Sequence, residues 1–141
     1  MNDEQKPVTA EGINKLLKFL PVFEQKDYKF VVGSTKSTLP FLLYSIEVNQ
    51  FTDLLYEEGF IVPFDWGKWQ DKAKQLCLEP NALEKADLDT LQKLLTLHVR
   101  KDRFCDGHLA TVLENGHITA VLRRLKEICS DPHNNGYAKF R

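Results

Sequence analysis

The densest group of chemically capable side chains lies between residues 98 and 108. His98 and Asp102 are four residues apart, a spacing that places both on one face of a helix, where an aspartate can orient an imidazole for general-base chemistry. The guanidinium of Arg103 can hold an anion through two parallel hydrogen bonds. Cys105 and His108 follow in a glycine-containing turn, and a thiol beside an imidazole is a pairing used in nucleophilic catalysis. These five residues are the candidate catalytic residues.

The same residues can also serve only as structure. In that alternative, Asp102, Arg103 and Asp65 form a buried hydrogen-bonded hub that holds a helix end against the segment with Trp66 and Trp69. We favour this hub over a ligand pocket and over catalysis, because structural networks perturb polar groups as active sites do. If the region does bind a ligand or a partner, the expected binding residues are Asp65, Trp66, Trp69, Arg100 and Arg103.

The histidines and cysteines do not form a recognised metal-binding pattern. A site would have to combine His98, Cys105, Asp106, His108 or His117, and the Cys105–His108 stretch lacks a second ligand pair at a known spacing. His98 falls on an apolar stripe, where a histidine is usually part of the core. We therefore expect no metal site and no cofactor.

The charge balance argues against a globally basic nucleic-acid-binding protein. Nineteen lysines and arginines stand against twenty aspartates and glutamates, which gives a net charge of −1. A local basic face could form from Arg123, Arg124 and Lys126, but Glu127 lies at ion-pairing distance along the same helix. Nucleic-acid binding through this face is the least favoured alternative.

The cysteine content and the apolar runs indicate a cytoplasmic chain. The three cysteines are widely spaced without a CxxC pair, the first residues are polar, and no apolar run approaches the roughly 20 residues that span a bilayer. We expect reduced thiols and no membrane association.

Apolar periodicity predicts a mainly α fold, a compact bundle of five to six helices in one domain over residues 1–141. The expected helices are 10–20, 46–58, one that Asp65 caps and Pro80 ends, 87–103, 108–114 and 118–129. Thr9, Ser45 and Asp87 are the expected caps of three of them. Residues 28–32 either pair with 60–62 as a minimal two-stranded sheet or form coil, and residues 1–8 and 130–141 are expected to be loose.

Three phrases occur together in this chain: Phe64-Asp65-Trp66 with Trp69 behind it, the run from Arg100 to Gly107, and Gly116-His117-Ile118 leading to Leu122-Arg123-Arg124-Leu125. With them the chain resembles an uncharacterised family of small bacterial proteins, known as a domain of unknown function. The resemblance covers most of the chain, from the first expected helix to the last. It implies a compact helical fold and brings no activity, substrate or cofactor.

The function that we favour from the sequence is a small, non-enzymatic interaction module that binds an unknown partner protein or a second copy of itself. The recognition surfaces would be the region of Trp66 and Trp69 and the turn from Arg103 to His108. One alternative is an enzyme or ligand-binding protein that holds a small anionic substrate through Arg103 and His108. The other is accessory nucleic-acid binding through the basic face.

Overall fold

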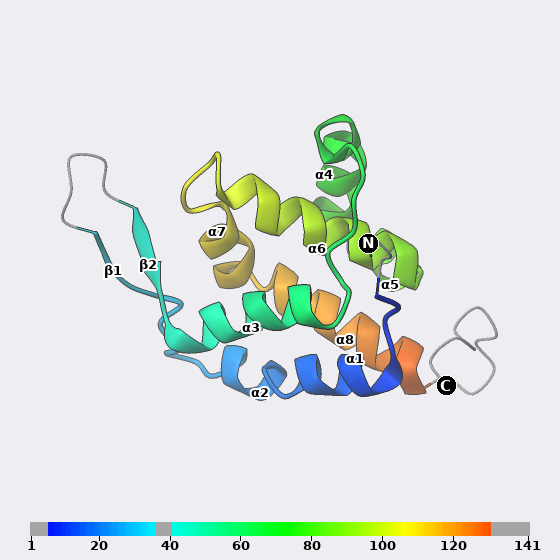
Figure 1. The fold of residues 1–141 in the computed structure, drawn as a ribbon, viewed down its shortest axis with the longest axis horizontal. Coiled ribbons are helices and arrows are strands. Elements are labelled where there is room, and N and C mark those ends of the chain that lie inside the picture. Colours follow the sequence, from blue (N-terminus) through cyan, green and yellow to red (C-terminus); the bar gives the residue numbers. More distant parts are fainter. Residues whose placement is uncertain (1–5, 36–40, 131–141) are drawn as a thin grey trace.

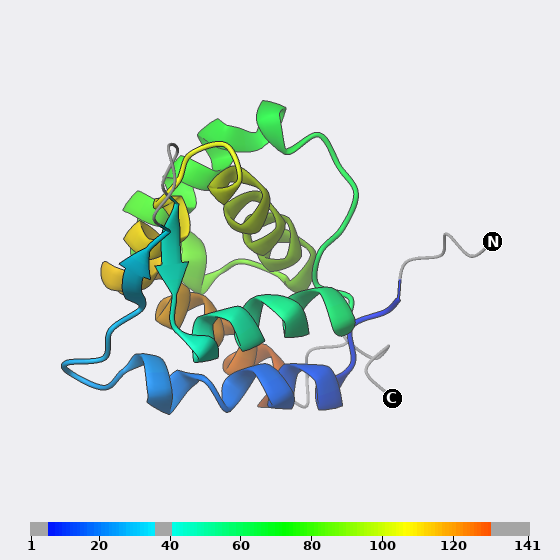
Figure 2. The ribbon, with the colours of Figure 1, turned by 60° about the vertical axis from the view of Figure 1, so that its left-hand side comes forward.

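The computed structural model describes residues 6–35 and 41–130, and it confirms the mainly α fold with a minimal β element (Figures 1 and 2). A short 3-10 helix, η1, also precedes one of the α-helices. The elements in chain order are α1 (Ala10–Leu17), α2 (Leu20–Phe23), β1 (Val31–Ser34), β2 (Leu42–Tyr44), α3 (Ile46–Glu57), η1 (Trp66–Trp69), α4 (Gln70–Leu78), α5 (Pro80–Glu84), α6 (Leu88–Asp102), α7 (His108–Glu114) and α8 (His117–Ser130).

Helices α6 and α8 form the centre of the hydrophobic core. Helix α8 contacts α1, α2, α5, α6 and α7, and its apolar stripe of Ile118, Val121, Leu122 and Leu125 is fully buried. This stripe follows the three-and-four spacing of an amphipathic helix. Helix α6 is buried around most of its circumference, which explains why even its polar residues Thr96 and His98 lie inside the protein.

Three of the expected helix caps are confirmed. The side chain of Thr9 accepts a hydrogen bond from the Gly12 amide, that of Ser45 accepts one from Val48, and that of Asp87 accepts one from Thr90. Each bond satisfies an amide at the start of a helix that has no partner within the helix.

The pairing of residues 28–32 with 60–62, one of the two alternatives left open by the sequence, does not occur. Strand β1 pairs instead with β2 in an antiparallel hairpin that projects from one end of the helices (Figure 1). Residues 60–62 are extended but are held by α6, where the Val62 amide donates to Thr96 Oγ1 at 2.9 Å. The hairpin forms because its two strands are close in sequence, so little chain entropy is lost in bringing them together.

The helix expected between Asp65 and Pro80 consists of two elements, η1 and α4. Its first turn is η1, and the side chain of Asp65 makes no capping hydrogen bond. Helix α4 ends at Leu78, just before Pro80, as expected. Pro80 then begins α5, since a proline fits the first position of a helix, where its missing amide hydrogen has no intrahelical partner in any case. The resulting break between α4 and α5 brings Cys77 and Pro80 to one border of a pocket.

Most of the two ends that were expected to be loose, residues 1–5 and 131–141, lie outside the described residues. Val8, which belongs to the expected loose range 1–8, is instead buried in the core. Among residues 6–35 and 41–130, no helix combines the length and the apolar character needed to cross a membrane.

Candidate functional site

The centre of the candidate site is His98, on the buried side of α6. Only 1% of its surface is exposed, and apolar residues precede it along the same face of the helix. An imidazole in such a place needs partners for both ring nitrogens, because a buried polar atom without one costs roughly 1–3 kcal/mol.

His108 supplies one of these partners. It is the first residue of α7, and its Nε2 lies 2.9 Å from Nδ1 of His98. The other ring nitrogen of His98, Nε2, is buried and has no hydrogen-bond partner among the described residues. Because every buried polar atom without a partner calls for an explanation, this nitrogen is the most informative atom in the site.

His117 and Cys77 are the other two titratable neighbours of His98. His117 begins α8, where its backbone amide donates to Asn115 Oδ1, and its ring meets that of His98 edge-on with the centroids 5.0 Å apart. Cys77, in the last turn of α4, places Sγ 3.5 Å from Nε2 of His117. Three helices that are distant in the sequence therefore bring two imidazoles and one thiol together.

The donor atoms of Cys77, His98 and His117 all lie within 4.8 Å of one another. Two ligands of a tetrahedral zinc ion, at about 2.3 Å for sulfur and 2.0–2.1 Å for nitrogen, are separated by about 3.6 Å. The observed 3.5 Å between Cys77 Sγ and His117 Nε2 matches that separation. For a donor pair at the 4.8 Å limit, metal binding would require the two atoms to move closer by only about 1 Å.

Burial keeps the three groups uncharged. It lowers the pKa of His117 to about 4 and the pKa of His98 well below its ordinary value, with the neighbouring histidines adding to both effects. Burial also raises the pKa of the Cys77 thiol, against a smaller opposing effect from the positive charge of Lys101. The pKa of His108 is lowered by burial and by Lys101.

These pKa directions bear on what Cys77 and His117 can do as a pair. A nucleophilic cysteine needs a thiolate, which a neighbouring histidine stabilises by taking up the proton. Here the pKa of the thiol is raised and that of the imidazole is lowered, so the proton stays on sulfur. A nucleophilic pair would also leave Nε2 of His98 without a role, whereas a metal ion would bind the thiolate and both imidazoles at once.

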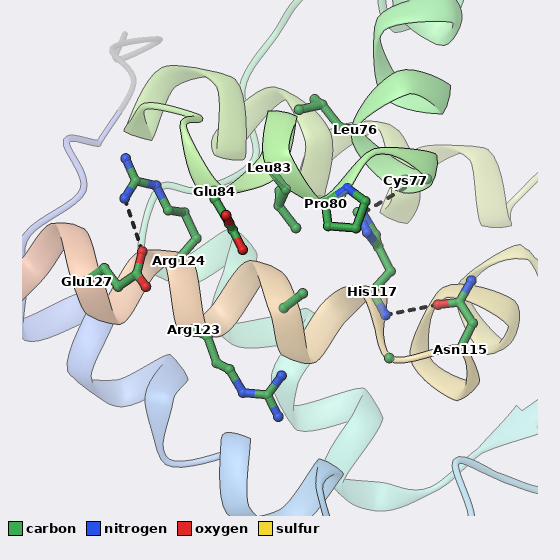
Figure 3. A pocket seen from close by; sticks show the side chains of 12 residues that line it. Leu76, Cys77, Pro80, Leu83, Glu84, Asn115, His117, Arg123, Arg124 and Glu127 are labelled. Carbon is green, nitrogen blue, oxygen red and sulfur yellow. Dashed lines mark hydrogen bonds and ion pairs between the residues drawn. The ribbon is translucent and has the colours of Figure 1, made fainter.

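A pocket of about 410 Å³ opens beside this cluster, between α4, α5 and α8 (Figure 3). Cys77 and His117 lie on its border, as do four apolar residues: Leu76, Pro80, Leu83 and Ala120. Arg124 donates to the backbone oxygen of Ala86 and pairs with Glu127, and Arg123 pairs with Glu24. The pocket therefore joins the thiol and imidazole to solvent.

The predicted site residues between 98 and 108 have separate partners. Asp102 does not orient His98. Its Oδ1 accepts hydrogen bonds from the Tyr44 hydroxyl and from the Leu109 amide, both at 2.9 Å. Arg103 donates to the Tyr56 hydroxyl, Cys105 is exposed, and Arg100 is half-buried on α6. Of the five candidate catalytic residues, His98 and His108 are hydrogen-bonded to each other.

The expected hub of Asp65, Asp102 and Arg103 does not form. Asp65 is exposed and pairs with Lys68, while Asp102 and Arg103 bind tyrosines on different elements. Trp66 and Trp69 are partly buried and pack against the core. Trp66 also stacks on the exposed ring of Phe104, with the ring centroids 6.0 Å apart.

The sequence analysis considered His98 and His117 but not Cys77. Cys77 lies on a different helix from either histidine and 21 residues before His98, so no local spacing joins them. One signal was available: both histidines occur on the apolar face of a strongly amphipathic helix. Two such residues on inner faces can meet in the core.

Comparison with known protein families matches residues 8–131 to a family described as "Family of unknown function (DUF6508)". No curated protein matches the chain, and no solved structure does.

Proposed function

The chain belongs to DUF6508, a family of unknown function, and we propose from the geometry of the site that it binds a divalent transition metal at Cys77, His98 and His117. The observation that carries this proposal is the buried Nε2 of His98, which has no hydrogen-bond partner among the described residues and belongs to a group of three potential ligands. A metal ion gives this nitrogen the partner that it otherwise lacks.

The donor set favours zinc. One thiolate and two imidazoles are soft and borderline ligands, which zinc prefers, whereas magnesium and calcium take oxygen ligands. A single zinc ion at the centre of the group would bind Cys77 Sγ, His98 Nε2 and His117 Nε2. The low pKa values of the two histidines assist binding, because metal and proton compete for the same nitrogen lone pair.

His108 supports this arrangement through its hydrogen bond to His98. A histidine that ligates a metal through Nε2 ordinarily donates its Nδ1 proton to a second residue, which fixes the tautomer and the ring orientation. The Nε2 atom of His108 stands where that acceptor is required, 2.9 Å from Nδ1 of His98. With His98 as the donor in this hydrogen bond, its Nε2 is bare and can bind the metal.

The direct test is a zinc titration of the untagged full chain after chelator treatment, measured by isothermal titration calorimetry. One zinc per chain is expected. Cys77→Ala should weaken binding at least a hundredfold, while Cys129→Ala, which removes another half-buried free thiol, should leave it unchanged. Equal zinc affinity in the Cys77→Ala variant, or no binding by the wild type, would contradict the proposal.

A second candidate function is the protein interaction favoured by the sequence. The observation in its favour is Phe104, whose side chain is 76% exposed beside Trp66, in the region expected to be a recognition surface. Large exposed aromatic residues are common at the centres of interfaces. If the partner is a second copy, sedimentation should show a concentration-dependent dimer that Phe104→Ala weakens. A monomer at all concentrations would argue against self-association.

The other two functions remain proposals with less support. An anionic substrate held by Arg103 and His108 would need their side chains to converge, and they have different partners. Nucleic-acid binding would use Arg123 and Arg124, both of which are paired with glutamates. Salt-sensitive binding to DNA or RNA would be the result in its favour.

A further inference from the structure

The number of protein ligands at the proposed metal site determines what else the site can bind. Structural zinc sites are closed by four protein ligands, whereas catalytic sites use three and leave the fourth position to water or substrate. Among residues 6–35 and 41–130, the group holds three candidate ligands, Cys77, His98 and His117. His108 is not a member of this group, and its Nε2 instead lies 2.9 Å from Nδ1 of His98.

The fourth position faces the pocket. Cys77 and His117 line the pocket, whereas His98 is 1% exposed and does not (Figure 3). A metal bound by all three would therefore have His98 on its protein side and the pocket on its open side. The pocket volume of about 410 Å³ lies within the range of roughly 300–1,000 Å³ that is typical of small-molecule sites.

We propose that the pocket binds a small monoanionic molecule, which coordinates the metal through a carboxylate or similar oxygen donor and places an apolar body against the pocket walls. This inference rests on the proposed metal site and names the class of ligand that the site would take. In this proposal, pocket residues that are not metal ligands also contact the bound molecule.

The charges around the pocket favour an anionic head group at the metal. A zinc dication with one thiolate keeps a net positive charge, and Lys101 adds a second positive charge that acts on Cys77 and His98. The arginines at the rim are not free to bind the anion instead. Arg123 is paired with Glu24, Arg124 is paired with Glu127, and the two side chains point apart (Figure 3).

The rest of the pocket favours an uncharged body. Glu84 extends over the pocket in Figure 3, and a second negative charge on the ligand would meet it at close range. Leu76, Leu83 and Ala120 offer apolar surface beneath it. A monoanion with an aliphatic chain or a small ring fits both conditions, whereas the second negative charge of a dianion would be repelled by Glu84.

Cobalt-loaded full-length protein and three hydroxamates test this inference. Acetohydroxamate supplies the head group alone, hexanohydroxamate adds an apolar chain, and the monohydroxamate of glutaric acid adds a negative charge at the far end. Each should shift the visible absorption of the cobalt while the thiolate-to-cobalt band persists, which marks a ternary complex. The hexanoyl compound should bind at least tenfold more tightly than the acetyl compound, and the glutaryl compound less tightly than the hexanoyl one.

Two variants of pocket residues that are not ligands sharpen the test. Ala120→Phe fills the pocket and should keep cobalt but lose the tenfold gain from the longer chain. Glu84→Gln removes the rim charge and should narrow the difference between the hexanoyl and glutaryl compounds without changing cobalt binding.

The failures of the two proposals can be distinguished. If the protein binds cobalt and no hydroxamate shifts the absorption, or if the thiolate band disappears because the hydroxamate strips the metal, the ligand site is wrong and the metal site stands. Equal affinity for the acetyl and hexanoyl compounds would also overturn the ligand site. If the protein binds no cobalt at all, both proposals are wrong.

Discussion

Nδ1 of His98 lies 2.9 Å from Nε2 of His108, and this one contact determines which nitrogen of His98 is left without a partner. A hydrogen bond between two neutral imidazoles holds a single proton. When that proton is on His98, its Nε2 is a bare lone pair, free to bind a metal with Cys77 and His117. The proposed metal site requires this tautomer.

Replacing His108 should weaken metal binding although His108 does not touch the metal. His108→Leu removes the acceptor for Nδ1 of His98, and losses of about 10–100-fold in affinity are usual when such a supporting residue is removed. His108→Gln, whose side-chain oxygen can accept the same hydrogen bond, should recover much of the loss. Zinc calorimetry measures both. Equal affinities in the wild type and in His108→Leu would show that His108 does not position His98.

The stability of the metal-free protein should fall as the pH falls from about 6.5 to about 4. The pKa of His117 is near 4 in the folded protein and near its ordinary value of 6.5 in the unfolded chain, so the unfolded chain takes up a proton first. The loss from this one group is about 3 kcal/mol once the pH has dropped through both values. His98 adds to it in the same direction.

Urea unfolding at several pH values measures this loss. The slope of unfolding free energy against pH is proportional to the number of protons taken up on unfolding. In the His117→Gln variant this number should be smaller by up to one over the same range. Bound zinc should oppose the loss at the upper end of the range, because it competes with protons for both histidines. A slope in His117→Gln equal to that of the wild type would show that His117 is not the titrating group.

Asp102 should matter for stability and not for metal binding. Its Oδ1 accepts hydrogen bonds from Tyr44 on β2 and from the Leu109 amide in α7, so it ties the hairpin and the start of α7 to the end of α6. Asp102→Ala should lower the unfolding free energy by about 3 kcal/mol, since hydrogen bonds to charged groups contribute roughly 1.5–3 kcal/mol each.

Asp106→Ala is the matched control for Asp102→Ala. Asp106 makes one exposed bond to the Leu42 amide, so its replacement should cost about 1 kcal/mol or less. Both variants should bind zinc like the wild type at a temperature where they are folded. A large loss of affinity in Asp102→Ala, measured on folded protein, would instead make this residue part of the site.

Local sequence rules predicted the elements well where a single side chain determines a boundary. Thr9, Ser45 and Asp87 cap helices as expected, because a cap depends only on neighbouring amides. The helix before Pro80 ends as expected, but α5 was not predicted, because a proline is compatible with both the end of one helix and the start of the next.

These rules predicted the site less well than the helix boundaries. His98 lies within α6, His108 and His117 begin α7 and α8, and Cys77 comes from α4. Their meeting depends on how four helices pack, which spacing along the chain does not encode. Asp102 was predicted to face His98 because the two are four residues apart, but the tertiary partners Tyr44 and Leu109 determine where its carboxylate lies.

Zinc K-edge X-ray absorption on the loaded full-length protein tests the central claim most directly. The account predicts one sulfur scatterer at about 2.3 Å and three nitrogen or oxygen scatterers at about 2.0–2.1 Å, with the multiple-scattering pattern of two imidazoles. The sulfur contribution should vanish in Cys77→Ala and persist in Cys129→Ala. A shell of nitrogen and oxygen atoms alone in the wild-type protein would contradict a metal bound by Cys77, His98 and His117.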